Sequence, residues 1–486
     1  MMHKLSDILV DVQVEKRINT MDCDIENIVF DSRQAGASSL FVAMRGTQVD
    51  GHDFIEQVLA AGCRCVVCEE LPAAYPSDAV MIKVVDSAKT LGLLAAAFYG
   101  HPSQQLKLVG VTGTNGKTTT ATLLYHLVMD LGYKAGLFST VANFIGKSKI
   151  QATHTTPDAV TLNKIMADMV AAGCEYCFME VSSHALAQNR VAGLQFAGAL
   201  FTNITHDHLD YHLTFKAYIA AKKLFFDELG KEAFALINGD DKNGQIMVQN
   251  TQASVYRYSL KSMGDFKGRI IESMFEGMQL ELDGQEIWTQ FVGDFNAYNL
   301  LNVYGAACLL GLDRDEVQVA LSRLKPVDGR FETIRSAAGK TAIVDYAHTP
   351  DALKNVIETI NQVRQPDQQL ITVVGAGGDR DASKRPEMAH EAVVGSSKVI
   401  LTADNPRSEE PEDIIAQMME GVSFKERIKV LSIVNRREAI RTACMVAGPG
   451  DIILIAGKGH ETYQEIKGER IHFDDREVVS EVFNEG

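Results

Sequence analysis

Three things are scarce in this sequence of 486 residues: long apolar runs, an N-terminal leader and positive charge. The longest apolar run, LGLLAAAF near residue 95, is far shorter than a membrane-spanning helix requires. The N-terminal stretch MMHKLSDILVDVQVEKR has acidic and basic residues throughout, so it lacks the apolar segment of a signal peptide. We therefore expect a cytoplasmic protein without membrane insertion.

The charge balance is strongly acidic. Lys and Arg total 47 against 63 Asp and Glu, which gives a formal net charge of −16. Such a surface repels the phosphates of nucleic acids, so we expect no nucleic-acid partner. Small anionic substrates are not excluded, because a local cluster of basic side chains can still hold them.

The eight cysteines lack the spacing of a zinc site. Cys63, Cys65 and Cys68 are spaced like possible metal ligands, but no second Cys or His pair follows at zinc-ribbon spacing. They lie in an apolar run that reads as a strand, with Cys63 and Cys65 expected on one side and Cys68 on the other. Cys174 and Cys177 lead into a strand, whereas thioredoxin-like sites open a helix. All five are interpreted as buried reduced thiols.

The length exceeds what one hydrophobic core usually supports, and no internal repeat is present. Strands and helices alternate along most of the chain, which predicts α/β sheets covered by helices. The stretch 253–292 alternates in strand fashion and predicts an antiparallel appendage. Turn-rich breaks divide the chain into an N-terminal α/β domain (1–105), a central ATPase-like domain with a parallel sheet (106–332) and a C-terminal Rossmann-like α/β domain (333–486).

The segment VTGTNGKTT (111–119) resembles a phosphate-binding loop but lacks its first glycine, because Val111 stands there. A strand precedes it and an amphipathic helix follows, as such a loop requires. Lys117 can reach phosphate oxygens and the Thr118 hydroxyl can bind Mg²⁺. Gly110 and Gly113 are expected to supply the flexibility at the loop's entry.

Two acidic segments follow. Glu180 ends the predicted strand of YCFMEVSSH, at the sheet edge where ligands of doubly wound folds lie. The segment NITHDHLDYH (203–212) allows two interpretations. His206, His208, Asp210 and His212 could form a metallo-hydrolase cluster, or His208 alone could contribute to a Mg²⁺ site.

The last third holds two candidate ligand loops. VVGAGGDRDASKRP fails as a dinucleotide loop because Arg380 stands where a glycine is needed. It presents Asp379, Arg380, Lys384 and Arg385, which suits carboxylate recognition. In ADNPRSEEP, a rigid Asn-Pro turn presents Arg407.

The loop TGTNGKTT resembles that of the Mur ligase superfamily, the ATP-dependent amide-forming enzymes of peptidoglycan synthesis, and further matches extend in family order from about residue 30 to 461. The resemblance implies two Mg²⁺ ions held by Thr118, Glu180, His208 and Lys222, of which Lys222 would be carbamylated. It implies catalytic roles for Lys117, Glu180, His208, Lys222 and Arg330. The implied ATP-binding residues are Gly113, Thr114, Asn115, Gly116, Lys117, Thr118, Thr119, Asn296, Arg330 and Asp345.

The resemblance also assigns two further substrates. A UDP-sugar-peptide would contact Phe30, Ser32, Thr47, Gln48, Val49, His154, Thr155, Thr156, Ser182, Gln188 and Arg190; relatives often have Asn where His154 stands. The motif D-N-P-R marks members that add meso-diaminopimelate, whose second carboxylate suits a bidentate Arg. Its implied contacts are Arg380, Asp404, Asn405, Pro406, Arg407, Gly457 and Glu461.

The resemblance thus implies a ligase that uses ATP to add meso-diaminopimelate to UDP-N-acetylmuramoyl-L-alanyl-D-glutamate through an acyl phosphate. Addition of L-lysine or another diamine is the alternative within this class. A catalytically inactive nucleotide-binding regulatory protein is the alternative outside it. The expected partners are these small molecules, and we expect a monomer.

Overall fold

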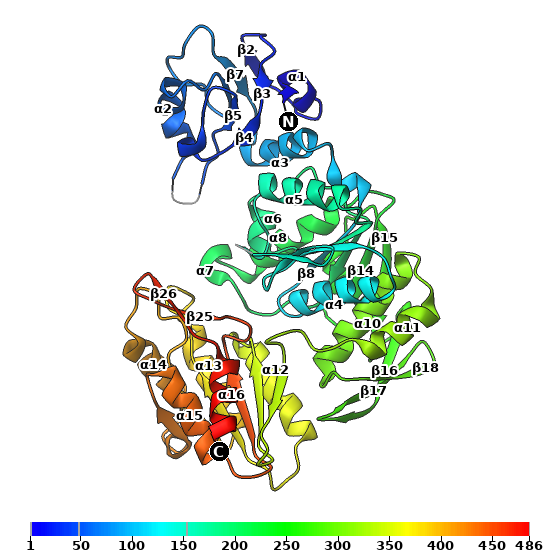
Figure 1. The fold of residues 1–486 in the computed structure, drawn as a ribbon, viewed down its shortest axis with the longest axis vertical. Helices are drawn as coiled ribbons and strands as arrows, with labels where there is room; N and C mark the ends of the chain where they lie inside the picture. Colours follow the sequence, from blue (N-terminus) through cyan, green and yellow to red (C-terminus); the bar gives the residue numbers. More distant parts are fainter. Residues whose placement is uncertain (1, 47–48, 152–153, 486) are drawn as a thin grey trace.

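The computed structural model describes residues 2–46, 49–151 and 154–485, and it has three lobes that follow one another in chain order (Figure 1). Each lobe is built around its own main sheet. The predicted three-part α/β architecture is confirmed, whereas the predicted boundaries at residues 105 and 332 stay predictions. None of the described helices is both long enough and apolar enough to cross a membrane.

The N-terminal lobe contains a five-stranded sheet in the order β2-β7-β6-β5-β4. Strands β4 to β7 are parallel, and β2 pairs antiparallel with β7 at the edge. The elements are β1 (His3–Lys4), α1 (Leu5–Ile8), β2 (Lys16–Ile18), β3 (Asp24–Ile25), β4 (Asn27–Val29), η1 (Ser32–Gln34), β5 (Ser39–Val42), η2 (Gly51–Phe54), α2 (Ile55–Ala60), β6 (Cys65–Cys68), β7 (Val80–Lys83), α3 (Ser87–Phe98) and η3 (Pro102–Gln105).

The cysteines of this lobe correct one detail of the prediction. Cys65 and Cys68 lie on opposite faces of β6, but Cys63 joins the same core cluster as Cys68. The prediction that Cys63 and Cys65 lie on the same side was wrong. Cys63 precedes β6, so the alternation of side chains along that strand does not apply to it. These three thiols, Cys174 and Cys177 are buried and free, which confirms their interpretation as buried thiols.

The middle lobe is an eleven-stranded sheet in the order β11-β10-β9-β12-β8-β13-β14-β15-β16-β17-β18. Strands β9, β12, β8, β13, β14 and β15 are parallel. Helices α4, α10 and α11 pack on one face and α5 and α8 on the other. The elements are β8 (Lys107–Thr112), α4 (Lys117–Asp130), β9 (Ala135–Phe138), β10 (Asn143–Ile145), β11 (Ser148–Ile150), α5 (Ala159–Ala171), β12 (Tyr176–Glu180), α6 (Ser183–Ala187), β13 (Gly198–Phe201), α7 (Leu209–His212), α8 (Phe215–Asp227), β14 (Phe234–Asn238), α9 (Gly244–Met247), β15 (Ser254–Ser259), β16 (Phe266–Met274), β17 (Gly277–Leu282), β18 (Gln285–Thr289), α10 (Asp294–Leu309) and α11 (Arg314–Arg323).

The predicted antiparallel appendage begins later than expected. β15 pairs parallel with β14, and only β16, β17 and β18 form an antiparallel meander. The cause is the short helix α9, which connects β14 to β15 as a crossover and so returns the chain in the same direction.

The C-terminal lobe has a six-stranded sheet in the order β19-β20-β24-β21-β22-β23, parallel apart from β19. Helices α12, α13 and α14 cover one face and α15 and α16 the other, which confirms the predicted doubly wound fold. The elements are β19 (Glu332–Arg335), β20 (Thr341–Asp345), α12 (Pro350–Val363), β21 (Leu370–Val374), α13 (Lys384–Gly395), β22 (Lys398–Leu401), α14 (Pro411–Met419), η4 (Arg427–Lys429), β23 (Val430–Ser432), α15 (Arg436–Val446), β24 (Ile452–Ala456), β25 (Tyr463–Ile466), β26 (Glu469–His472) and α16 (Asp475–Glu485).

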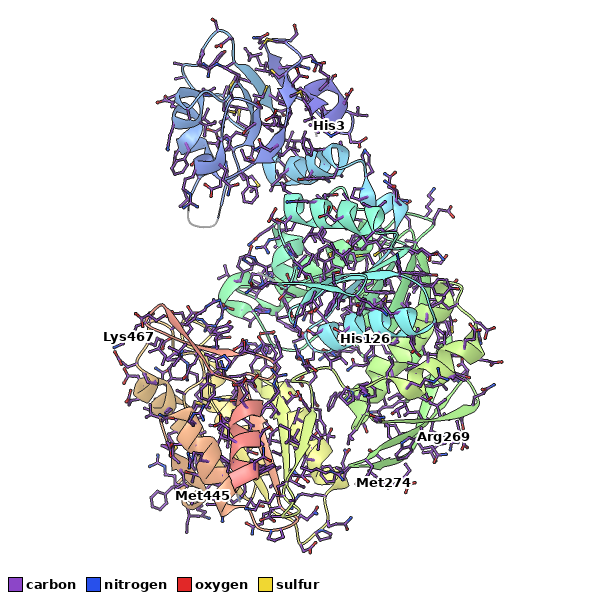
Figure 2. The ribbon with its side chains drawn as sticks, in the orientation of Figure 1. His3, His126, Arg269, Met274, Met445 and Lys467 are labelled. Carbon is purple, nitrogen blue, oxygen red and sulfur yellow. The ribbon has the colours of Figure 1, made fainter. Side chains whose placement is uncertain are left out.

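A small hairpin, β25–β26, stands on the C-terminal lobe, with Lys467 at its tip (Figure 2). Lys467 and Gly468 both have positive φ (50° and 85°), as a two-residue turn between twisted strands requires. The Arg407 N–H donates to the Glu465 carbonyl (3.1 Å), and the Lys467 N–H donates to the Arg407 carbonyl (2.6 Å). The hairpin therefore fixes the backbone of Arg407.

Candidate active site

The phosphate loop, residues 113–116, connects the end of β8 to the start of α4. Gly113 has φ 148°, and a Cβ there would lie 1.9 Å from Thr202 Oγ1. Gly116 has φ 85°, and a Cβ there would lie 2.5 Å from Asn299 Oδ1. Both positions require glycine because of the backbone conformation and because neighbouring atoms approach closely.

Gly110 has a different role from the one predicted. It lies inside β8, with no positive φ, and faces the helix α8. A Cβ at Gly110 would lie 2.4 Å from Phe225 Cζ and 2.9 Å from both Phe196 and Val181. Gly110 therefore makes room for packing, and the loop's entry depends on Gly113 alone.

Lys117, the first residue of α4, folds back over the loop. Its Nζ donates to the carbonyl oxygens of Gly113 (3.0 Å) and Thr114 (2.7 Å). Burial lowers the pKa of this ammonium group. These carbonyls hold the ammonium at the N-terminus of α4, where backbone N–H groups favour bound phosphate.

Glu180, at the end of β12, is buried and accepts three hydrogen bonds. The Thr118 hydroxyl donates to Oε2 (2.9 Å), and Thr140 donates through its N–H to Oε1 (2.6 Å) and through its hydroxyl to Oε2 (3.2 Å). The predicted pair Thr118 and Glu180 is thus brought together. Thr140, which follows β9 at the same edge of the sheet, was missed by the sequence analysis.

His208 lines the same cavity as this pair and has a strained backbone conformation, with φ 53°. Burial, together with the nearby His184, Lys117 and Lys222, lowers the pKa of His208 to about 3, although the Asp207 carboxylate acts in the opposite direction. The imidazole is therefore neutral near pH 7, which is the form that binds metals. Asp207, another residue missed from the sequence, accepts the His208 N–H (2.9 Å).

The alternative metallo-hydrolase cluster does not form. The His206 imidazole is directed at Asp381 (3.8 Å), and His212 packs between the rings of His184 and Tyr218 (5.7 and 5.3 Å between centroids). Among the described residues, no three His, Cys, Asp or Glu side chains gather as a metal would require.

Lys222, on α8, is buried with 1% exposure, while its neighbour Lys223 pairs with Asp227 (2.5 Å). The Lys222 Nζ donates a hydrogen bond to the Gly113 carbonyl (2.7 Å). Burial holds the pKa of Lys222 well below its usual range, and nearby Lys117 adds to the effect. A buried amine of this kind is chemically reactive in its neutral form.

Arg330 reaches across from the turn after the middle lobe. Its Nη2 donates to the Thr118 hydroxyl (3.0 Å), and its guanidinium lies over the ring of Tyr346 (4.5 Å to the centroid). Its Nε is buried without a partner among the described atoms. Asp345, the residue before Tyr346, accepts the Phe331 N–H (2.7 Å) and so fixes this turn.

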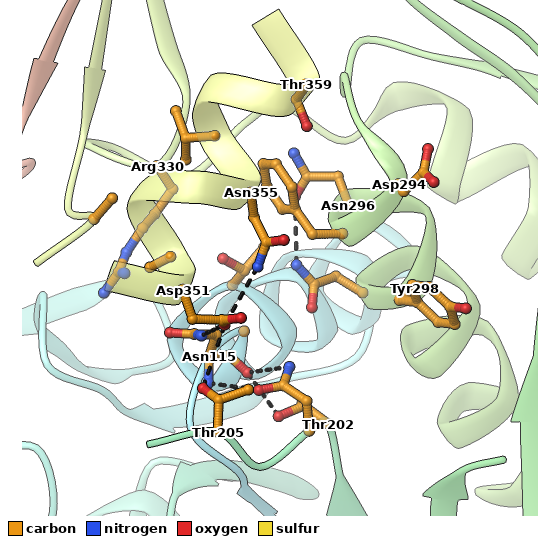
Figure 3. Close-up of a pocket in the computed structure, with 18 of the residues that line it drawn as sticks. Asn115, Thr202, Thr205, Asp294, Asn296, Tyr298, Arg330, Asp351, Asn355 and Thr359 are labelled. Atoms are coloured by element: carbon orange, nitrogen blue, oxygen red, sulfur yellow. Dashed lines mark hydrogen bonds between the residues drawn. The ribbon is translucent and has the colours of Figure 1, made fainter. Parts of the chain in front are cut away.

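A cavity of about 430 Å³ opens on one side of the phosphate loop, between α10 and α12 (Figure 3). Asn115 Nδ2 donates to Asp351 Oδ2 across the two lobes (3.0 Å), and Asn296 Nδ2 donates to the Val292 carbonyl (3.0 Å). Its lining includes the predicted ATP residues Asn115, Gly116, Thr119, Asn296, Arg330 and Asp345.

A second cavity of about 500 Å³ lies on the other side of the loop and shares Asn115, Gly116 and Arg330 with the first. It extends from Glu180 to the C-terminal lobe. Its lining includes the predicted residues Thr114, Asn115, Gly116, Lys117, Thr118, His154, Thr155, Thr156, Glu180, Ser182, Arg190, His208, Lys222, Arg330, Arg380, Asp404, Asn405, Arg407, Gly457 and Glu461.

Arg407 lies at the C-terminal end of this second cavity. It has φ 52°, a left-handed conformation that a non-glycine residue rarely adopts. Its Nη1 donates to the Gly378 carbonyl (2.6 Å). Pro406 does not line the cavity; its carbonyl lies where a Cβ on Gly378 would be (1.9 Å), so it positions the turn.

The loop after β24, residues 457–461, contributes Gly457 and Glu461 to the second cavity. Gly457 has φ 117°, and a Cβ there would lie 2.5 Å from Asp404 Oδ2. Gly329, beside Arg330, has φ 66°, and a Cβ there would lie 2.1 Å from the His460 nitrogen and 2.4 Å from the Gly459 carbonyl carbon. The turn that carries Arg330 thus lies directly against the loop that carries Glu461.

Two basic residues predicted to be free for carboxylate recognition are already paired. Arg385 is 2% exposed and pairs with Glu409 through two nitrogens (both 2.8 Å). Lys384 pairs with Asp207 of the middle lobe (2.6 Å). These two ion pairs could not be predicted from the sequence, because the two residues of each pair are far apart in the chain.

The predicted UDP-sugar contacts divide into two groups. His154, Thr155, Thr156, Ser182 and Arg190 line the second cavity, and Gln188 accepts two hydrogen bonds from Arg190 (3.0 and 2.6 Å). Phe30, Ser32 and Val49 lie in the N-terminal lobe and line neither described cavity. Thr47 and Gln48 lie outside the described residues.

Known protein families match three long segments of the chain. Three family models match: "Mur ligase family, catalytic domain" over residues 24–99, "Mur ligase middle domain" over 111–307 and "Mur ligase, glutamate ligase domain" over 329–459. The chain is 56% identical over 482 residues to "UDP-N-acetylmuramoyl-L-alanyl-D-glutamate--2,6-diaminopimelate ligase" of Cytophaga hutchinsonii and 55% identical over 481 residues to that of Bacteroides fragilis, with 99% of each chain covered.

A solved structure described by the same enzyme name is 32% identical, with a TM-score of 0.70 over 100% of this chain and 99% of that one. The three family models lie in chain order, and the relatives match nearly the whole chain. The chain therefore belongs to the Mur ligase family and is an ATP-dependent amide ligase.

Proposed function

We propose that this ligase joins meso-diaminopimelate to UDP-N-acetylmuramoyl-L-alanyl-D-glutamate in peptidoglycan precursor synthesis. The names of the relatives at 56% and 55% identity support this substrate pair. The observation that carries the proposal is the second cavity, which has phosphate-loop residues and Glu180 at one end and Arg407 with Glu461 at the other. A phosphate-activating site and an amino-acid site thus share one space.

ATP is proposed to bind with adenine in the first cavity and its phosphates over Lys117. An oxygen of the D-glutamate side-chain carboxylate attacks the γ-phosphorus, and the bond from that phosphorus to the bridging oxygen breaks, which releases ADP. The reason for this step is that a carboxylate would have to lose oxide, whereas an acyl phosphate loses phosphate. Arg330, hydrogen-bonded to Thr118, is placed to stabilise charge on the transferring group.

The amine of the amino acid then attacks the acyl carbon. Phosphate leaves, the nitrogen loses a proton and the amide forms. Water would hydrolyse the acyl phosphate, so its exclusion is required. The ion pair between Lys384 and Asp207 and the contact between Asn115 and Asp351 hold the two lobes together around this space.

Magnesium fits the residues at the acidic end. The Thr118 hydroxyl, the Glu180 carboxylate and the neutral His208 imidazole are suitable donors, and we assign them as its ligands. When bound, Mg²⁺ supplies positive charge that neutralises the phosphate oxygens.

Lys222 is the fourth proposed ligand, as a carbamate. Its neutral amine would attack CO₂, form an N–C bond and release a proton, which turns a potential cation into an anion. Support comes from its burial beside Lys117, since two ammonium groups there repel each other. Intact-protein mass spectrometry under CO₂ should detect the added mass on Lys222 and none on a Lys222→Met variant.

At the other end, Arg407 is proposed to bind the distal carboxylate of meso-diaminopimelate and Glu461 its ammonium. The deciding experiment compares ATP turnover with meso-diaminopimelate and with L-lysine. Turnover with meso-diaminopimelate alone supports the proposal, and turnover with lysine alone overturns it. The regulatory alternative predicts no turnover with either. Monomeric state and cytoplasmic location stay predictions.

A further inference from the structure

Lys458 is a buried cation that the proposed chemistry does not use. It follows Gly457 in the loop after β24 and has no exposed surface. Its Nζ donates to Asn405 Oδ1 (3.1 Å) and to Glu461 Oε2 (3.0 Å), and it lies over the ring of Tyr463 (5.4 Å to the centroid). Asn405 and Glu461 line the second cavity, but Lys458 does not, so it supports them from behind.

The contacts of Lys458 decide how Asn405 is turned. Asn405 Oδ1 accepts from Lys458 and also from the Glu465 N–H (2.9 Å). The amide nitrogen is therefore directed the other way, and Nδ2 donates to Glu461 Oε2 (2.8 Å). A flipped amide would place an NH₂ group against an ammonium and an N–H donor.

The same contacts leave one carboxylate oxygen of Glu461 available. Both side-chain hydrogen bonds recorded for Glu461 in the described chain end on Oε2, one from Lys458 and one from Asn405. Oε1 receives none of them. A ligand amine can therefore meet Oε1, with the orientation of the carboxylate already fixed.

The pair also sets the local charge. Lys458 and Glu461 together are neutral, as are Asp404 and Arg380 in the same cavity, which leaves the positive charge of Arg407. A ligand ammonium group without a neighbouring carboxylate gains little here, because its attraction to Glu461 is opposed by its repulsion from Lys458. An end group with both an ammonium and a carboxylate gains from Glu461 and from Arg407 together.

We propose that Lys458 is a positioning and specificity-determining residue: it orients Asn405 and Glu461 and makes the site select a zwitterionic end group over a bare amine. This inference rests on the proposed function, since it concerns the proposed amino-acid site. It assigns the discrimination of meso-diaminopimelate from lysine partly to a residue that neither substrate touches.

The test uses the full-length Lys458→Met enzyme. We expect the KM for meso-diaminopimelate to rise about tenfold or more, and the preference for it over lysine in kcat/KM to fall about tenfold, while the KM for ATP changes little. Arg470→Met is the matched control, because Arg470 also lies over the Tyr463 ring (4.5 Å) but is 64% exposed, and its recorded ion pair is with Glu465 rather than with Asn405 or Glu461. It should retain the wild-type preference.

Lys458→Gln removes the positive charge but keeps a hydrogen-bond donor that can orient Asn405. It also replaces the Met variant in the test if that variant does not fold. Its amide can still donate to Asn405, so the KM should rise less, but the preference should fall as in the Met variant. Equal losses with both amino acids, or an equal rise in the KM for ATP, would make Lys458 merely structural and overturn the inference.

Failure of the proposed function is distinguishable from failure of this inference. If the wild-type enzyme turns over neither amino acid, the substrate assignment fails. Calorimetric binding of meso-diaminopimelate and of cadaverine, a diamine without carboxylates, then tests Lys458 directly. The wild type should bind only the zwitterion, and Lys458→Met should narrow the difference; an unchanged difference overturns the inference.

Discussion

Two adjacent lysines of α8 lie in opposite environments. Lys222 is buried against the Gly113 carbonyl and the Tyr218 ring, whereas Lys223 forms a half-buried ion pair with Asp227 one turn further along the same helix. The charge of Lys223 is therefore already matched within α8. Only Lys222 is in a position to influence the phosphate loop.

Lys222→Ala should therefore lower turnover at least about a hundredfold, as removal of a charged group from a preorganised site does. Lys223→Ala should retain most of the wild-type activity. Coupled assays of ADP release measure both. Bicarbonate should not rescue Lys222→Ala, because no amine remains to be carbamylated. An active Lys222→Ala enzyme would disprove the proposed carbamate.

Arg407 gives a second prediction for a single residue. Arg407→Ala should raise the KM for the amino acid at least tenfold, since a hydrogen bond to a charged group contributes about 1.5–3 kcal/mol. The KM for ATP should change much less, because the phosphate loop is at the other end of the cavity. Steady-state kinetics with each substrate varied separately gives both constants. Equal rises would indicate a structural role.

The sequence predicted the loop, the acid and most of the lining of the second cavity, because many of these residues follow strand ends at one edge of a sheet. It did not predict Thr140, Asp207 or Lys458. Their roles depend on partners far away in the chain, such as Lys384, which lies 177 positions from Asp207. The burial of Lys222 could not be predicted either, because Lys222 and Lys223 are adjacent in α8 and the sequence does not show which of them faces the core.

At the scale of elements, β8 and α8 lie unusually close at one point. Gly110 leaves no room for a methyl group against the ring of Phe225, which lies on the same helix as Lys222. The distance between strand and helix therefore decides where Lys222 meets the phosphate loop. The sequence interpretation assigned Gly110 to loop flexibility because it could not anticipate this packing.

Gly110→Ala should lower the free energy of unfolding by about 1–3 kcal/mol, the usual effect of overpacking. Urea unfolding measures this loss. Phe225→Leu in the same chain should restore part of it, because it removes the ring atom that a Cβ would meet. Gly230→Ala is the matched control, since a Cβ there would meet nothing within 4 Å. Equal effects at both glycines would contradict the packing argument.

The turn after β15 depends on one carboxylate at the end of β14. Burial raises the pKa of Asp240, but hydrogen bonds from Ser262, Ser259 and Tyr298 outweigh this and bring it from 3.8 to about 2. A lowered pKa means that the stabilisation is present above the unfolded value and is lost as the pH falls through the folded one.

Asp240→Asn should therefore lower the free energy of unfolding near pH 7 by about 1–2 kcal/mol, allowing for partial exposure. The difference from wild type should shrink as the pH falls from about 4 toward about 2. Thermal unfolding across this range tests the prediction, with exposed Asp367→Asn as control. A difference independent of pH would show that the charge of Asp240 is not involved.

At the scale of the whole molecule, the side chains of Asp351 and Lys384 make polar contacts that join the C-terminal lobe to the middle lobe. Asp351 accepts from Asn115 (3.0 Å) and Thr205 (3.3 Å), and Lys384 pairs with Asp207. Both contacts lie beside the phosphate loop. The ion pair of Arg335 with Glu276 (3.0 Å) and the packing of Val292 and Phe295 against the C-terminal core also join the lobes, so Asp351 contributes part of the interface.

Asp351→Ala should favour a more open arrangement by up to about tenfold in population, because each lost hydrogen bond contributes about 0.5–1.5 kcal/mol. Small-angle X-ray scattering should record a larger radius of gyration than for the wild type. Asp367→Ala, on an exposed turn of the same lobe, should leave the scattering unchanged. Identical curves for all three proteins would show that Asp351 does not hold the lobes together.

The direct contact between Gly329 and the loop 457–461 gives the proposed ATP and amino-acid sites a physical route for coupling. If the amino acid orders that loop, it also restrains the turn that carries Arg330, which contacts Thr118 in the phosphate-loop region. Binding free energies are reciprocal, so if one substrate increases the affinity for the other, the second must increase the affinity for the first by the same factor. Gly329 would then be the point at which the loops of the two proposed sites restrain each other.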